Sequence, residues 1–124
     1  MIEYLKHFIG TPYKFGGNVT QDGGIDCGAL ILEGLRSEGM WNKTDATAQN
    51  IFDNLKLKCL PKGAPGKNCL LFFGTTSQSI THIAIAIDSI KMLEAGGNDK
   101  DGMVRIRPIK WRKDLVAVLQ LELD

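Results

Sequence analysis

Residues 81–88, T-H-I-A-I-A-I-D, decide the fold class, because successive side chains of a β-strand point to opposite faces of a sheet. The three isoleucines share one face, and His82 and two alanines share the other. The isoleucine face requires a hydrophobic core. The opposite face is small apart from the imidazole, so we expect a helix to pack closely over His82.

The rest of the C-terminal half continues this strand-like pattern, whereas the N-terminal half has helical periodicity. We expect a hairpin between residues 81–88 and 91–95, turning near Asp88 and Ser89. Helices followed by an antiparallel sheet make an α+β domain, and 124 residues fit a single domain spanning residues 1–124. The predicted helices cover residues 2–9, 27–38 and 47–56, and the five predicted strands cover residues 69–73, 81–88, 91–95, 104–107 and 115–121.

Local signals indicate where these helices begin and end. Asp26 is a good N-cap for the second helix, and Gly39 is a plausible end for it. Asp45 or Thr44 would cap the third helix. In the first helix, four apolar residues share one face: Ile2, Leu5, Phe8 and Ile9.

The composition excludes several classes of protein. With 15 basic and 14 acidic residues, the chain lacks the basic footprint of a nucleic-acid-binding protein. We interpret its one local basic cluster, Lys110, Arg112 and Lys113, as a solvated loop or strand edge. No apolar run of about 18 residues is present, which argues against membrane insertion. The first ten residues do not resemble a signal peptide, so we expect synthesis in the cytoplasm.

Three cysteines at irregular spacing make a poor disulfide framework, and the absence of a C-x-x-C pair argues against a zinc site. We therefore predict no metal and no cofactor. A lone nucleophilic thiol is the more economical hypothesis, and its imidazole partner must be His7 or His82. His7 lies on the polar side of the first helix, where solvent exposure explains it. Cys59 and Cys69 are interpreted as structural.

Cys27 has the surroundings of a reactive cysteine. A thiol reacts as its thiolate, which the positive end of a helix dipole and a nearby imidazolium both favour. Cys27 directly follows the predicted N-cap, and glycines on both sides leave room for a substrate backbone. The amides at the helix start could stabilise an oxyanion. The alternative is a buried structural cysteine, which is the usual state of a free thiol.

His82 is the candidate base, provided that the helix beginning at Cys27 packs over it. A base works best when an acceptor holds its other ring nitrogen. In the predicted hairpin, Glu94 lies within a residue or two of the position opposite His82 and could supply that acceptor. The alternatives are a structural histidine and an exposed glutamate.

Three segments together resemble the motifs of the NlpC/P60 family of papain-like cysteine peptidases: G-T-P-Y-K-F-G-G at 10–17, I-D-C-G-A-L at 25–30 and T-H-I-A-I-A-I at 81–87. The resemblance implies a papain-like core with Cys27 as nucleophile, His82 as base and Glu94 as the third catalytic residue. Glu94 stands where histidine is commoner, and Gly28 where many members have serine. The candidate substrate-binding residues around them are Tyr13, Asp26, Gly28 and Thr81.

The resemblance also implies a substrate. Family members commonly hydrolyse the bond between D-glutamate and diaminopimelate or lysine in peptidoglycan stem peptides. The stretches A-T-A-Q-N-I-F-D at 46–53 and M-L-E-A-G-G at 92–97 resemble the compact, phage-derived branch. We therefore expect a phage lysin, released with the help of a holin, or a tail-associated hydrolase; either would act on the bacterial cell wall. The alternatives are a papain-like amidase or acyltransferase and a non-catalytic phage structural component. The oligomeric state is left open.

Overall fold

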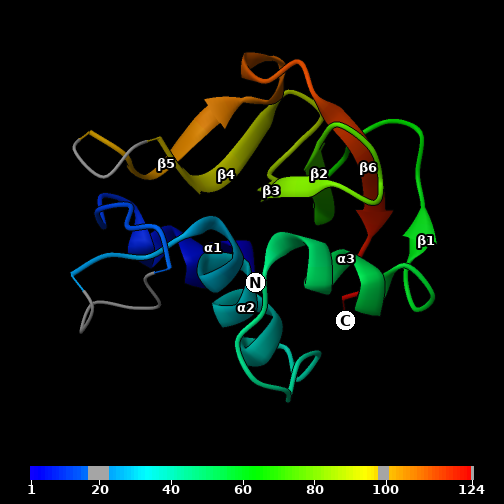
Figure 1. The fold of residues 1–124 in the computed structure, drawn as a ribbon, viewed down its shortest axis with the longest axis horizontal. Coiled ribbons are helices and arrows are strands. Elements are labelled where there is room, and N and C mark those ends of the chain that lie inside the picture. The colour runs from blue at the N-terminus through cyan, green and yellow to red at the C-terminus, as the bar shows by residue number, and fades with distance from the viewer. Residues whose placement is uncertain (17–22, 98–100, 124) are drawn as a thin grey trace.

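A computed structural model describes residues 1–16, 23–97 and 101–123 and shows helices gathered on one side of a sheet (Figure 1). The three predicted helices correspond to α1, α2 and α3; a 3-10 turn, η1, directly follows α1, and another, η3, lies between β5 and β6. The elements are α1 (Ile2–Leu5), η1 (Lys6–Phe8), α2 (Cys27–Ser37), α3 (Ala48–Leu55) and η3 (Ile109–Trp111).

The sheet has six strands in the order β1-β6-β2-β3-β4-β5, and every neighbouring pair is antiparallel. This confirms the predicted α+β class. The five predicted strands are β2 to β6, while β1 has only two residues, too few to show an alternating pattern. The strands are β1 (Leu60–Pro61), β2 (Cys69–Gly74), β3 (Ile80–Ala86), β4 (Lys91–Gly96), β5 (Met103–Pro108) and β6 (Leu115–Gln120).

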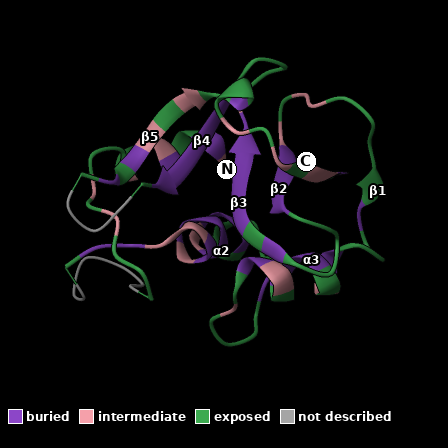
Figure 2. Ribbon diagram, turned by 45° about the horizontal axis from the view of Figure 1, so that its top comes forward, coloured by how far each residue is buried: buried purple, intermediate pink, exposed green. Residues whose placement is uncertain are grey.

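The helices pack on the isoleucine face of β3, so the prediction that a helix covers the His82 face was wrong. Ile83 and Ile85 are fully buried in one core with the apolar residues of α2 and α3. Ala84 and Ala86 lie in a second, smaller cluster that Ile109 of η3 covers. The hydrophobic effect grows with apolar area, so the helices stabilise the fold more on the larger isoleucine side chains. Buried residues occupy β3 and the inner surface of α2 (Figure 2).

The first helix is shorter than predicted. Regular α-helix ends at Leu5, and η1 continues only to Phe8. Ile9 already has extended backbone angles, φ −54° and ψ 130°, and its side chain is 45% exposed. The prediction that Ile9 belongs to the helix and to its apolar face was therefore wrong, because the chain leaves the helical path before this residue.

The N-caps of α2 and α3 are side-chain oxygens. Asp26 accepts a hydrogen bond from the Ala29 amide at 2.8 Å, as predicted. For α3 the prediction of Asp45 or Thr44 was wrong: Thr47 caps the helix and forms a reciprocal capping box with Asn50. Thr47 directly precedes the first helical residue, which is where a capping oxygen reaches the free amides.

After η1 the chain runs along the outer edge of β5. The Gly10 amide donates to the Val104 carbonyl, and the Val104 amide donates to the Thr11 carbonyl, both at 2.9 Å. The Tyr13 amide donates to the Gly102 carbonyl at 2.9 Å. These bonds cover much of one sheet edge and fix Tyr13 close to the end of β4.

Candidate active site

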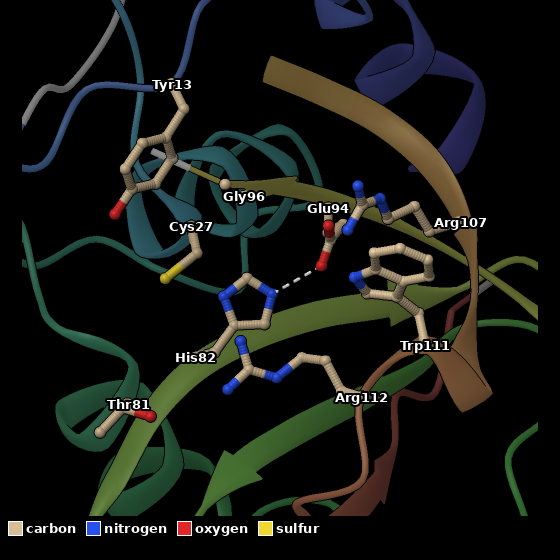
Figure 3. A pocket seen from close by; sticks show the side chains of 10 residues that line it. Tyr13, Cys27, Thr81, His82, Glu94, Gly96, Arg107, Trp111 and Arg112 are labelled. Atoms are coloured by element: carbon tan, nitrogen blue, oxygen red, sulfur yellow. Dashed lines mark hydrogen bonds and ion pairs between the residues drawn. The ribbon is translucent and has the colours of Figure 1, made fainter. Parts of the chain in front are cut away.

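The motif residues meet in a cavity of about 320 Å³ at the start of α2. Cys27 lines it from the helix, His82 from β3 and Glu94 from β4. Figure 3 shows the sulfur, the imidazole and the carboxylate side by side in that order. Cys27 and Glu94 are 67 positions apart in the chain. They share one site with His82 because α2 packs against β3 and β4.

Cys27 is the first residue of α2 and is half-buried. The Asp26 cap fixes the helix start, so the thiol sits where the helix dipole is positive. Cys59 and Cys69 are buried, and the Cys69 thiol donates to the Gln120 side-chain oxygen at 3.3 Å. All three cysteines are free. Only Cys27 combines access to the cavity with a helix N-terminus.

His82 and Glu94 form a buried hydrogen-bonded ion pair. Nε2 of His82 donates to Oε1 of Glu94 at 2.8 Å, and the two residues are 6% and 3% exposed. The predicted hairpin produces this contact: Ala86 pairs with Met92, and the Asp88 carboxylate accepts from the amides of the turn. The other ring nitrogen, Nδ1, points toward the Cys27 sulfur (Figure 3).

The surroundings of His82 favour its charged form. Burial alone would lower its pKa, but hydrogen bonds to Cys27 and Glu94 and the charges of both partners outweigh burial and raise the pKa to about 9. Burial tends to raise the pKa of Glu94, yet the bond to His82 and the positive charges of His82, Arg107 and Arg105 lower it overall. At neutral pH the pair is therefore imidazolium and carboxylate.

Arg105 lies behind this pair, directly opposite Glu94 in the register of β4 and β5. Its Nε is 3.7 Å from Oε2 of Glu94, the carboxylate oxygen that His82 does not use. Within the described ranges, this buried Nε has no hydrogen-bond partner. Its contribution to Glu94 is therefore electrostatic.

The order of the motifs along the chain and the meeting of thiol, imidazole and carboxylate can be compared with known proteins. The sequence model of the NlpC/P60 family matches residues 10–120. The chain belongs to the NlpC/P60 family. A comparison with curated proteins found no match.

Solved structures share the fold of this NlpC/P60 chain. The peptidoglycan hydrolase RipB from Mycobacterium tuberculosis is 19% identical with a TM-score of 0.76, and the match covers 99% of this chain but 63% of RipB. The NlpC/P60 domain of the peptidoglycan hydrolase SagA is 19% identical with a TM-score of 0.75, covering 97% and 95% of the two chains. RipD from M. tuberculosis, described as a non-catalytic, peptidoglycan-binding NlpC/P60 protein, is 20% identical with a TM-score of 0.72, covering 98% and 94%. The chain thus spans less than two thirds of RipB.

The four candidate substrate-binding residues of this NlpC/P60 chain divide into two groups. Tyr13 and Thr81 line the cavity. Asp26 and Gly28 do not: the Asp26 carboxylate caps α2, and a Cβ built on Gly28 would lie 2.9 Å from the Ala46 carbonyl oxygen. The lack of a side chain at Gly28 therefore allows the segment before α3 to pack against α2.

Sequence reasoning missed three side chains that line the cavity: Arg107, Trp111 and Arg112. The interpretation of Arg112 as solvated was wrong, because its guanidinium forms a two-bond ion pair with Asp114, at 2.9 and 2.7 Å, and lies over the Phe73 ring. Lys110 and Lys113 are exposed, as expected. An acidic residue two positions after Arg112 was the only local signal.

In residues 1–16, 23–97 and 101–123, no group of three or more His, Cys, Asp or Glu side chains is placed to hold a metal ion. Over the same part of the chain, no helix has the length and apolar character needed to cross a bilayer.

Proposed function

We propose that this chain is a cysteine peptidase that hydrolyses peptidoglycan stem peptides, with Cys27 as nucleophile, His82 as general acid and base, and Glu94 as the third catalytic residue. The observation that carries the proposal is the meeting of these three side chains in one cavity. The RipB and SagA structures, both described as peptidoglycan hydrolases, support the substrate class.

In the proposed reaction the Cys27 thiolate attacks the carbonyl carbon of the scissile amide, and a carbon–sulfur bond forms. The Cys27 amide, which has no acceptor within the helix, is a candidate donor to the oxyanion. As the carbon–nitrogen bond breaks, His82 gives the proton on Nδ1 to the leaving amine. His82 then accepts a proton from a water molecule, which attacks the thioester. The carbon–sulfur bond then breaks with its electron pair going to sulfur, the new carboxylic acid leaves, and the thiolate–imidazolium pair is restored.

Glu94 has two tasks in this scheme. Its bond to Nε2 keeps Nδ1 directed toward the sulfur, and its charge stabilises the imidazolium that holds the proton. A carboxylate suits the second task, because a neutral acceptor would orient the ring without favouring its charged form. Glutamate at this position therefore fits a general-acid role for His82.

We further propose that the bond cut lies between D-glutamate and diaminopimelate or lysine, and that the protein acts on the cell wall as a phage lysin. Both points rest on the motif resemblance. The two alternatives are a papain-like amidase or acyltransferase with the same acyl-enzyme, and a non-catalytic structural or binding protein such as a phage tail component. The second has a precedent in RipD, but the presence of Cys27 and His82 together favours catalysis.

The direct test is digestion of defined stem peptides by the wild type and by Cys27→Ala. We expect cleavage only by the wild type; equal cleavage by both would rule out Cys27 as the nucleophile. Added amine nucleophiles, with product masses determined, distinguish hydrolysis from acyl transfer. Alkylation of the native protein gives an independent readout: Cys27 should react much faster than the buried Cys59 and Cys69.

A further inference from the structure

Of the two arginines that line the cavity, one forms no salt bridge with any residue that the structure describes. Glu94 is engaged by His82 on one oxygen and by Arg105 on the other. Arg112 is engaged by Asp114. In the part of the chain that the structure describes, Arg107 has no ion pair. Among the described residues, Arg107 is therefore the cavity-lining arginine that remains available to a ligand.

An aromatic contact restrains the position of Arg107. Its guanidinium carbon lies over the Trp111 ring, 4.1 Å from the ring centre, which places the cation on the face of the indole. Figure 3 shows this stacked pair on the wall of the cavity across from Cys27. Stacking occupies a face of the guanidinium and leaves its N–H edge free to donate. An arginine held in this way loses little side-chain entropy when it binds a planar anion.

The electrostatics favour an anion at this position. Partial burial and the like charge of Arg105 both lower the pKa of Arg107, and Glu94 only partly opposes them. Two arginines on the same face of one strand, Arg105 and Arg107, thus repel each other next to the cavity. A bound carboxylate would relieve that repulsion.

We propose that Arg107, stacked on Trp111, is a subsite for a free carboxylate of the substrate beside the scissile amide. This inference rests on the proposed function and specifies its substrate: acidic stem peptides, with a free carboxylate, over amidated ones. A guanidinium edge matches a carboxylate with two parallel N–H···O bonds, whereas a carboxamide offers one acceptor and loses the charge.

A stem peptide offers this carboxylate from two sources. A D-glutamate joined through its side chain keeps its α-carboxylate, which becomes a neutral amide in isoglutamine. Diaminopimelate has a second carboxylate that lysine lacks. Four tripeptides, with glutamate or isoglutamine in the middle and diaminopimelate or lysine at the end, separate the two sources.

The experiment measures kcat/KM for the four tripeptides with the wild type, Arg107→Gln and Arg107→Lys. The wild type should prefer the member of one pair that carries the extra carboxylate by roughly tenfold or more. Arg107→Gln should reduce that preference to about one, and Arg107→Lys should keep part of it. Lys110→Gln removes a nearby exposed charge outside the cavity and should leave the preference unchanged.

Binding to Cys27→Ala, measured by calorimetry with the same four tripeptides, separates this inference from the proposed function. A carboxylate preference in binding that disappears with the added Arg107→Gln change supports the subsite even if no peptide is cut. Cleavage with a preference that does not depend on Arg107 overturns the subsite and leaves the peptidase intact. Equal affinities for all four peptides, or no binding of any, also overturn it.

Discussion

Replacing Glu94 with glutamine tests the electrostatic role of the carboxylate with little change in shape. The side chain is 3% exposed and accepts from Nε2 of His82 at 2.8 Å, so glutamine can keep the position but not the charge. We expect Glu94→Gln to lower both the pKa of His82 and the rate of peptide cleavage.

The size of the effect follows from the His82 pKa, which rises from 6.5 to about 9 in the folded protein. A tenfold change in a protonation constant is worth about 1.4 kcal/mol, so the imidazolium is favoured by roughly 3 kcal/mol. Cys27 and Glu94 both contribute to this rise. If they contribute equally, Glu94→Gln lowers the pKa by at least about one unit, and we expect kcat to fall by roughly tenfold or more.

The assay is an NMR titration of the His82 ring in wild type and Glu94→Gln, alongside kcat on a stem peptide. His7, the only other histidine, lies outside the site and provides internal reference signals. Glu3→Gln, which removes an exposed carboxylate, is the matched control and should change neither quantity. An identical His82 titration in wild type and Glu94→Gln would refute the reasoning.

Two further predictions concern stability. Gly28→Ala should lower the free energy of unfolding by about 1–3 kcal/mol in urea, because the new Cβ would lie 2.9 Å from the Ala46 carbonyl oxygen; an unchanged midpoint would contradict the close approach of these segments. Since the folded-state pKa of His82 is raised above 6.5, its contribution to stability is complete below about pH 6.5 and is lost as pH rises through about 9. Denaturation of wild type and Glu94→Gln at pH 6, 8 and 10 should show a stability difference that shrinks toward pH 10; a constant difference would argue against this linkage.

Local periodicity was sufficient to predict most of the elements that build the site. Alternating residues in β3 and β4 and the turn at Asp88 fix the register, and the register brings Glu94 to His82. The Asp26 cap was equally local, because a capping oxygen acts on amides only two or three residues away. Cys27 at the start of α2 followed from that cap.

Features set by tertiary packing could not be predicted in this way. Alternation in β3 defines two faces but does not say which one the helices cover, and the prediction chose the wrong face. Arg107 and Trp111 come from β5 and η3, and their contribution depends on how the end of β5 turns back over the cavity. No residue spacing in the sequence predicts that turn, so the two arginines that line the cavity, Arg107 and Arg112, were missed.

The two edge strands of the sheet, β1 and β5, affect how readily this protein aggregates at high concentration. Long open strands offer rows of unpaired N–H and C=O groups, which recruit strands from other molecules and start aggregation. Here β1 is only two residues long and includes Pro61, which has no N–H, while β5 ends at Pro108 and is covered by the chain around Thr11. Beyond β1, which pairs only with Leu119 and Gln120 of β6, the open stretch of β6 is short, so neither border gives an incoming strand a long ladder and the fold discourages fibril-like association.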